Sequence, residues 1–396
     1  MTPVPPFENM MLKIGRLRPI AAWIFDRPPD PGEILVGLAA ASRRIPQLRQ
    51  HLVRRFGWHF WVPARGSPDE LFRHAVTLVD DPALRDIDDL RRLLQKLDAM
   101  PFPADRPPWR ALVINAGGAG LPALVFQCEH AIADGIRIER IMRNFGAWAA
   151  ADREAGSMVD RIAATLDHRA LADILALPDE RGENRHDMVL TFAPAAMLRR
   201  GRNSGSATAM IIGAMADALA MPGTLAPGAI RSGLAMELIG ERRPGSPSGN
   251  FVAAQAVPAQ PANAPAARGR SFLFYLLART GPWRFRQAAL FPAALTRIIS
   301  TSFYRRFDIV ASVMPSSRKG SQVGAARADR VFGIGPVIGD THVSMTGFWS
   351  HGDCCLSIKP GPAIAISSPE LADRFLRALE ARAGPAETAG DGAAPG

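Results

Sequence analysis

Hydrophobic positions along this chain follow two different spacings, which predict strands and helices in alternation. Short apolar runs indicate buried strands, and we expect these at residues 21–25, 58–62, 72–78, 109–114, 121–128, 188–194, 231–238, 251–258 and 308–315. Apolar residues at helical spacing predict helices at 30–44, 86–100, 134–150, 204–220 and 370–383, with 46–55 continuing the first of them. Residues 153–185 are helical in pattern, and 342–358 predict a hairpin. The Gly-, Ala- and Pro-rich tail 384–396 is expected to be disordered.

The stretch 121–145 carries the candidate chemistry. Its apolar run ends at residue 128, and Asp134 stands where the N-cap of the following helix belongs, with Gly135 opening that helix. His130 therefore lies at a strand end, where a side chain leaves the core and can face a cleft. Imidazole accepts and returns a proton near neutral pH better than any other side chain. Glu129 precedes it and should point to the opposite face.

The net positive charge of the chain bears on which partners it could bind. The 396 residues allow one large or two medium domains and carry 47 basic against 37 acidic side chains, a net charge of +10. Only four of the basic residues are lysine. A GC-rich genome would explain this, and so would attraction to anionic lipid headgroups or to the phosphates of a nucleotide-bearing substrate. Nucleic acid is not expected, because the arginines are spread along the chain without a recognised binding motif.

Cysteine usage and the missing targeting signals bear on the compartment. Cys128, Cys354 and Cys355 are too few for a disulfide framework, and the last two are adjacent, a poor geometry for pairing. No metal-ligand spacing appears, so no metal is expected. The N-terminus lacks a signal-peptide pattern, and no apolar run is long enough to cross a membrane. These features predict a reducing, cytoplasmic location.

The pattern H-x-x-x-D-G, formed by His130, Asp134 and Gly135, resembles the HHxxxDG motif of the chloramphenicol acetyltransferase-like acyltransferases. In that superfamily the second histidine is the general base, and here Glu129 replaces the first. Further landmarks stand in the order typical of the bacterial wax ester synthase/diacylglycerol acyltransferase family. They are PQLRQHLV at 46–53, the segment 101–109 that ends in Pro-Pro-Trp, Gly249-Asn250 before a strand, Ser312-Val313-Met314-Pro315, Gly335-Pro336-Val337 and Trp349-Ser350-His351-Gly352. The resemblance covers about residues 21–383.

This resemblance implies an α/β (α+β) fold with two chloramphenicol acetyltransferase-like αβ sandwich lobes and a tunnel between them. The N-terminal lobe would span 1–185 and the C-terminal lobe 186–383. His130 would sit at mid-tunnel as the general base that moves a fatty acyl group from acyl-CoA to a lipophilic alcohol or diacylglycerol. No cofactor is implied beyond acyl-CoA as a substrate.

The resemblance also suggests roles for other residues. Asp134 and Gly135 would be structural parts of the motif, whereas Glu129, Asn250 and Ser312 are candidates for the substrate tunnel. Three places depart from the family pattern: Ala207-Thr208 replaces an Asn-Asp pair, Val313 replaces an asparagine, and Ser316-Ser317 replaces Gly-Pro.

Several alternatives remain open at this point. The donor could be a carrier-protein thioester, and the acceptor an amine or a polyketide hydroxyl. The chain could also be a non-catalytic lipid-binding relative. Residues 271–306 fit either core helices with a basic exposed face or an amphipathic element on a membrane or lipid-droplet surface, inserted through Trp283, Phe285, Phe291 and Phe303. The second reading implies a peripheral position on the inner face of the membrane.

Overall fold

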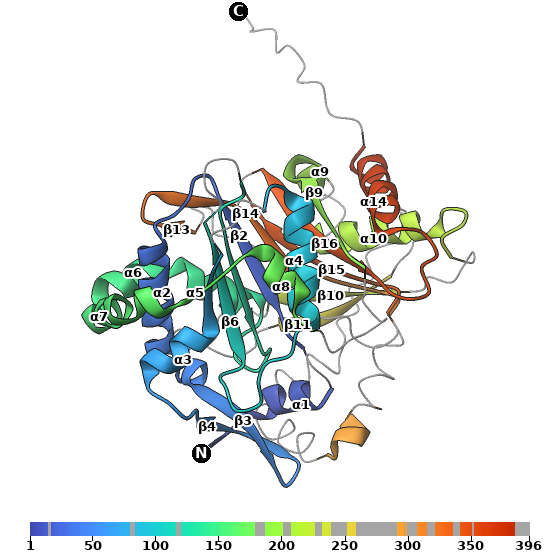
Figure 1. The fold of residues 1–396 in the computed structure, drawn as a ribbon. Coiled ribbons are helices and arrows are strands. Elements are labelled where there is room, and N and C mark those ends of the chain that lie inside the picture. The colour runs from blue at the N-terminus through green and yellow to red at the C-terminus, as the bar shows by residue number, and fades with distance from the viewer. Residues whose placement is uncertain are drawn as a thin grey trace, which may run out of the picture.

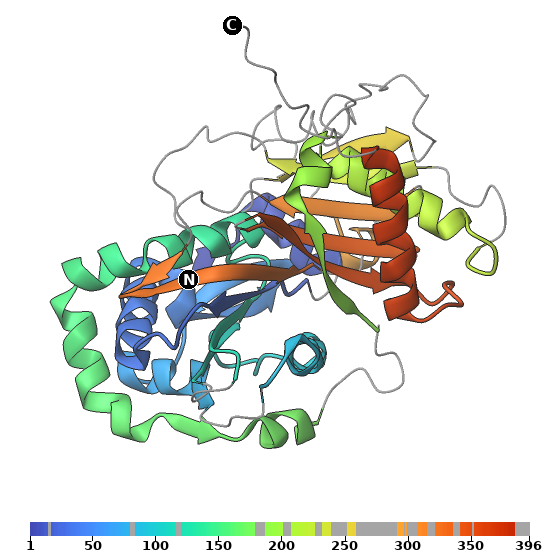
Figure 2. The same ribbon diagram turned by 90° about the horizontal axis from the view of Figure 1, so that it is seen from above.

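The computed structural model describes residues 1–14, 17–79, 84–115, 120–178, 187–200, 207–225, 232–238, 252–258, 291–296, 298, 307–314, 321–335, 341–350 and 352–384. These residues form two lobes that lie side by side, each built on a large sheet (Figures 1 and 2). Asn250, Ser316-Ser317, His351 and the tail 385–396 lie outside the described residues.

The first lobe is built on a seven-stranded mixed sheet in the order β13-β14-β2-β7-β6-β5-β8. Its strands are β2 (Ile20–Phe25), β5 (Val76–Val79), β6 (Trp109–Ile114), β7 (Ala123–Cys128), β8 (Asp167–Arg169), β13 (Gln322–Val323) and β14 (Ala326–Ile334). β7 lies near the centre, antiparallel to both β2 and β6. The strand that precedes His130 is therefore hydrogen-bonded on both edges and buried along its length.

Helices cover both faces of this sheet. One face packs in a continuous apolar core with α2 (Pro31–Arg44), α3 (Pro68–Ala75), α5 (Gly135–Arg143), α6 (Phe145–Ala151) and α7 (Arg153–Ile162). The other face packs with α4 (Ile87–Ala99) and α8 (Leu171–Ala176). Asp30, Asp86 and Asp134 are the N-caps of α2, α4 and α5, and the sequence indicated the cap at Asp134. A side-chain oxygen of each accepts a hydrogen bond from a backbone N–H in the first turn.

The second lobe is built on a six-stranded mixed sheet in the order β11-β10-β12-β15-β16-β9. These strands are β9 (Val189–Pro194), β10 (Ser232–Leu238), β11 (Val252–Pro258), β12 (Ile309–Met314), β15 (Val343–Trp349) and β16 (Asp353–Pro360). Its outer face packs against α10 (Ala207–Ala220) and α14 (Ser368–Ala383), with α9 (Ala195–Arg200) at one end (Figure 2). Its inner face is turned toward the first lobe, and Phe192 and Cys355 join the core around α4.

One strand joins the lobes. β14 pairs with β2 in the first sheet, although it stands between β12 and β15 in the sequence. Its C-terminal half also packs against β15 and β16, where Phe348 closely approaches Gly333. The division at residues 185/186 stays a prediction, and β14 is the segment of the second half that lies in the first sheet. The tunnel between the lobes also stays a prediction.

Three sequence-based assignments were wrong in part. Residues 46–55 do not continue a helix, because a single 3-10 turn at Pro46–Arg49 leads into β3 (Gln50–Arg55), which forms a hairpin with β4 (Trp58–Pro63). Phe56 and Gly57 have φ of 49° and 76°, which suits a two-residue hairpin turn. Of the strand expected at 72–78, residues 72–75 belong instead to α3, because Ser67 caps a helix that has Pro68 in its first turn, and the strand β5 begins at Val76. The helix expected at 134–150 is interrupted at Asn144, between α5 and α6.

A small third sheet, β1-β4-β3, projects from the first lobe beside α1 (Pro6–Ile14), with β1 at Thr2–Pro3 (Figure 1). His59 on β4 has a backbone N–H and a ring Nδ1 that both contact Oδ1 of Asn9, at 2.9 and 2.8 Å. Burial lowers the pKa of His59 to about 4, and the positive charges of Arg54 and Lys13 act in the same direction.

This pKa predicts a pH effect on stability. Below the usual histidine pKa of about 6.5, His59 is protonated in the unfolded chain but not in the folded one. The free energy of unfolding therefore falls as the pH is lowered from about 6.5 to 4. After allowance for solvent screening, we expect the substitution His59→Gln to make this loss of unfolding free energy smaller by about 1–2 kcal/mol. Urea unfolding of the wild-type protein and the variant at pH 7 and pH 4.5 measures the loss in each. An equal loss in both proteins would contradict the assignment.

Candidate active site

His130 stands directly beyond the end of β7, in the turn that leads to α5. The backbone of this turn is held by the flanking segments: the N–H of His130 donates to the carbonyl of Leu17 at 2.8 Å, and that of Glu129 donates to the carbonyl of Pro108 at 2.9 Å. The His130 side chain is half-buried, and its Nδ1 is enclosed by protein. The imidazole thus leaves the sheet at a rigid strand end, as the sequence predicts.

Asp134 organises the turn from within. It is 1% exposed, and its Oδ1 accepts a hydrogen bond from the backbone N–H of Arg137 at 2.9 Å, which caps α5. The Arg137 side chain is also buried. Burial and the neighbouring charge of Arg140 lower the pKa of Arg137, and the carboxylate of Asp134 opposes them. Asp134 therefore caps the helix, and its structural role in the motif stays a prediction.

Gly135 lies where the first lobe meets the second. A Cβ at this position would lie 2.4 Å from Sδ of Met314 and 3.6 Å from the ring of Phe348. These two residues lie at the C-terminal ends of β12 and β15. The missing side chain lets the N-terminus of α5 approach the second sheet closely. The motif turn is thus part of the junction between the lobes.

Glu129 takes part in a buried ion pair. Its Oε1 lies 3.7 Å from Nε of Arg18, and the two side chains are 12% and 5% exposed. Arg18 also donates to the carbonyl of Met100 at 2.6 Å, at the C-terminus of α4, where its charge suits the helix dipole. The residue that replaces the first histidine of the family motif therefore ties β7 to the end of α4.

Ser312 belongs to a row of hydroxyl groups across the second sheet. It pairs in register with Thr346 on β15, which pairs with Ser357 on β16, so the three side chains share the face turned toward the first lobe. Ser312 is half-buried. Its neighbour Val313 points the other way and packs in the core with α10 and α14, which suits an apolar residue at that position. Thr208 lies buried in the first turn of α10.

An ion pair that the sequence did not reveal also joins the lobes. Nζ of Lys359, near the end of β16, lies 3.0 Å from Oδ2 of Asp98 on α4, and the two side chains are 3% and 11% exposed. Lys359 also donates to the carbonyl of Gly335 at 3.2 Å. Partners separated by 261 positions leave no local pattern in a sequence.

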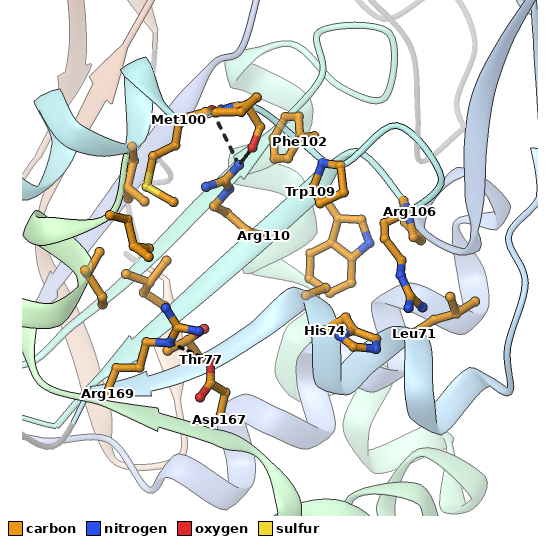
Figure 3. Close-up of a pocket in the computed structure, with 18 of the residues that line it drawn as sticks. Leu71, His74, Thr77, Met100, Phe102, Arg106, Trp109, Arg110, Asp167 and Arg169 are labelled. Carbon is orange, nitrogen blue, oxygen red and sulfur yellow. Dashed lines mark hydrogen bonds and ion pairs between the residues drawn. The ribbon is translucent and has the colours of Figure 1, made fainter. Parts of the chain in front are cut away.

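A cavity of about 590 Å³ lies in the first lobe, between the edge strands of the sheet and the C-terminal end of α4 (Figure 3). Its walls come from α3, the end of α4, β5, β6, β8, α8 with Leu177 after it, and the segment 100–107, and His130 is not among the lining residues. A second cavity adjoins it and shares His74, Asp167 and Arg169. No sequence motif indicated these cavities, because their walls are separate segments of the chain.

Two negative findings concern the described residues alone. Within them, no group of three or more His, Cys, Asp or Glu side chains is arranged to hold a metal ion. Nor do the helices traced there include one with the length and apolar character that crossing a bilayer requires. All three cysteines are buried, and burial raises the pKa of Cys355 to about 11, far from that of a reactive thiolate.

The two-lobed architecture matches that of solved chloramphenicol acetyltransferase-like proteins. A wax ester synthase/diacylglycerol acyltransferase from Marinobacter aquaeolei VT8 superimposes with a TM-score of 0.61 at 14% identity, over 97% of this chain and 100% of that one. The first condensation domain of the CDA synthetase gives 0.59 at 14%, over 98% and 96%. The SgcC5 protein from Streptomyces globisporus gives 0.57 at 15%, over 96% and 98%. At these identities the likeness shows the fold alone.

The model of the wax ester synthase/diacylglycerol acyltransferase catalytic domain matches residues 9–272. The chain belongs to this family, which confirms the resemblance noted in the sequence and places the protein among acyltransferases. A search of curated proteins finds no match.

Proposed function

We propose that this protein transfers a fatty acyl group from acyl-CoA to the hydroxyl of a lipophilic alcohol or diacylglycerol, with His130 as general base. The observation that carries the proposal is the place of the imidazole. It leaves a fully paired central strand and is followed by a helix whose first residue, Gly135, packs against the second lobe. An acyltransferase that joins two substrates needs such a base between the surfaces that hold them.

The proposed reaction needs neither a covalent intermediate nor a metal. The acceptor oxygen attacks the thioester carbonyl carbon while His130 takes the hydroxyl proton. The tetrahedral intermediate then collapses, the C–S bond breaks, and the imidazolium returns the proton to the departing thiolate. One proton is taken up and one released, so His130 is unchanged after each turnover.

The direct test measures both products. Purified protein is incubated with palmitoyl-CoA and either hexadecanol or dioleoylglycerol, and free thiol and ester are quantified together. Equal amounts of thiol and ester that depend on the acceptor support the proposal. Parallel reactions with palmitoyl-acyl carrier protein, and with an amine acceptor, distinguish the other donor and acceptor classes. No ester with any pair, at high protein concentration, would favour a lipid-binding relative without catalysis.

We further propose that the edge carrying the small sheet contacts an anionic lipid surface. The large apolar side chains that the described residues leave exposed are Met1, Phe56, Phe291, Leu295 and Ile298. Figure 1 places the N-terminus, the β3–β4 hairpin and the short helix near residue 295 along one edge of the molecule. Lys13 links these parts, since it lies 5.8 Å from the ring of Trp58 and donates to the carbonyl of Phe291. Of the four insertion residues suggested by the sequence, only Phe291 is described.

Charge and apolar exposure meet at the tip of this hairpin. Arg54 and Arg55 are exposed beside Phe56, whose side chain is fully exposed. We expect Phe56→Ser to weaken binding to phosphatidylglycerol vesicles about tenfold and Arg55→Gln about fivefold, the latter only at low salt. Arg27→Gln is the matched control, because that arginine is exposed beside β14, away from the hairpin. Vesicle flotation measures the bound fraction, and equal weakening by all three substitutions would contradict this surface.

A further inference from the structure

The first-lobe cavity combines apolar walls with one distinctive cation. Leu71, Leu97, Trp109, Leu112, Ile174 and Leu177 supply most of the apolar lining. The indole N–H of Trp109 donates to the carbonyl of Leu48 at 2.8 Å. A volume of about 590 Å³ is within the range of small-molecule binding sites.

Most charged groups around the cavity are neutralised by a neighbour. Arg169 lies 2.7 Å from Asp167, and Arg106 lies 3.8 Å from Glu70. Asp105 is exposed at the rim. These pairs leave no strong net field at the wide end of the cavity.

Arg110 differs from the other cations. It lies on β6, and its Nη2 donates to the carbonyls of Met100, at 3.4 Å, and Pro101 (Figure 3). Its guanidinium lies 4.7 Å from the ring centroid of Phe102. No carboxylate among the described residues forms an ion pair with it, and the nearby cation is Arg18, over the same ring at 5.3 Å. Burial, with Arg18, lowers the pKa of Arg110 to about 10, so the side chain is still charged at neutral pH.

Arg110 is half-buried. Withdrawing a cation from water without a carboxylate partner is costly, and an anion brought into the cavity would offset that cost. Apolar walls around a single cation fit an amphipathic monoanion with one charged end. We propose that this cavity binds a free long-chain fatty acid, with its carboxylate at Arg110 and its chain along the apolar wall formed by α3, β6 and the end of α8.

This site is distinct from the proposed catalytic centre. His130 does not line the cavity. Arg18, which shares the Phe102 ring with Arg110, forms its ion pair with Glu129, next to His130 in the sequence. The inference does not rest on the proposed function, and its test measures binding rather than turnover.

The first experiment locates the ligand. The full chain is irradiated with a diazirine analogue of myristate, digested and mapped by mass spectrometry. We expect labels within residues 71–77, 109–112 or 174–177, and unlabelled myristate should suppress them. Labels confined to other peptides, or none, would overturn the proposal.

The second experiment tests the carboxylate. Calorimetry with myristate below its aggregation concentration should show saturable binding, with 1-tetradecanol at least tenfold weaker. The substitution Arg110→Gln keeps a hydrogen-bond donor for one of the two carbonyls that Arg110 contacts. It should weaken the binding of myristate at least tenfold and leave the binding of tetradecanol unchanged. Arg169→Gln is the control and should change affinity less than threefold, because Asp167 already neutralises that charge. Equal affinity for acid and alcohol, or a larger effect of Arg169→Gln, would overturn the assignment.

A third variant guards against a folding defect in Arg110→Gln. Thr77 lines the same cavity from β5, so Thr77→Phe should fill part of it and abolish photolabelling of 109–112. His130→Ala should leave the same labelling intact. If Thr77→Phe folds and the labelling persists, or if His130→Ala removes it, the ligand does not occupy this cavity.

Discussion

His130→Ala is expected to lower acyl transfer by about 10²–10⁴-fold, with little change in the apparent affinity for palmitoyl-CoA. A general base acts mainly in the transition state, so its loss should appear in kcat rather than in KM. Thiol release and ester formation should fall together. The side chain is half-buried at a strand end, so the substitution should leave the folded lobe intact.

Two controls separate loss of the base from loss of structure. His342→Ala removes a histidine that lies 3.7 Å from Asp308 at the start of β15, and it should retain nearly full activity. Added imidazole should restore part of the activity of His130→Ala but not raise that of the wild-type protein. Turnover within threefold of wild type in His130→Ala would remove the general-base role.

Much of the first lobe could be predicted because its elements carry local signals. Asp30, Asp86 and Asp134 each precede an amphipathic segment, and each caps a helix in the structure. The strand before His130 was predicted from its apolar run, and that run is buried. The strand β4 was predicted, but its hairpin partner β3 was missed, because the periodicity of β3 is weak and the turn, Phe56-Gly57, lacks the Asn-Gly or Asp-Gly pair typical of such turns.

Some features of the candidate site could likewise be predicted from local sequence, and others could not. The position of His130 at a strand end and the helix cap by Asp134 follow from local pattern. The contact of Gly135 with Met314 and the pairing of β14 with β2 depend on segments more than a hundred residues apart, and the row of hydroxyls beside Ser312 depends on the register of three strands. Arg110 drew no attention in the sequence, because a guanidinium becomes unusual only when burial and the lack of a carboxylate are known.

These long-range contacts explain how the turn of His130 is held. Four features converge around it: the close approach of Gly135 to the second sheet, the insertion of β14 into the first sheet, the Arg18–Glu129 pair at the end of α4, and the Lys359–Asp98 pair on the same helix. Three of the four join the lobes, and two involve α4. The relative position of the two lobes is therefore linked to the end of α4. This end lies close to the strand end that carries the imidazole.

The second large effect is expected from Lys359→Met. Removing this lysine leaves the carboxylate of Asp98 between the lobes without its partner at 3.0 Å, and breaking a buried ion pair in this way costs about 3–5 kcal/mol of unfolding free energy. The carbonyl of Gly335 would lose a donor as well. Urea unfolding of the purified variant should show a large fall in the midpoint.

A double-mutant cycle separates the pair from its surroundings. Asp98→Leu alone should also destabilise, because it leaves the buried ammonium of Lys359, whereas Asp98→Leu combined with Lys359→Met should recover much of the loss, since two apolar groups replace two charges. The matched control is Arg374→Met, which removes a more exposed ion pair, that of Arg374 with Glu370 at 2.6 Å. Apart from the other contacts of Arg374, the loss of this pair should lower the free energy of unfolding by no more than about 1 kcal/mol. Additive losses in the double variant would mean that Lys359 and Asp98 do not stabilise the junction as a pair, and its stability would then depend on β14 and on the packing around Gly135.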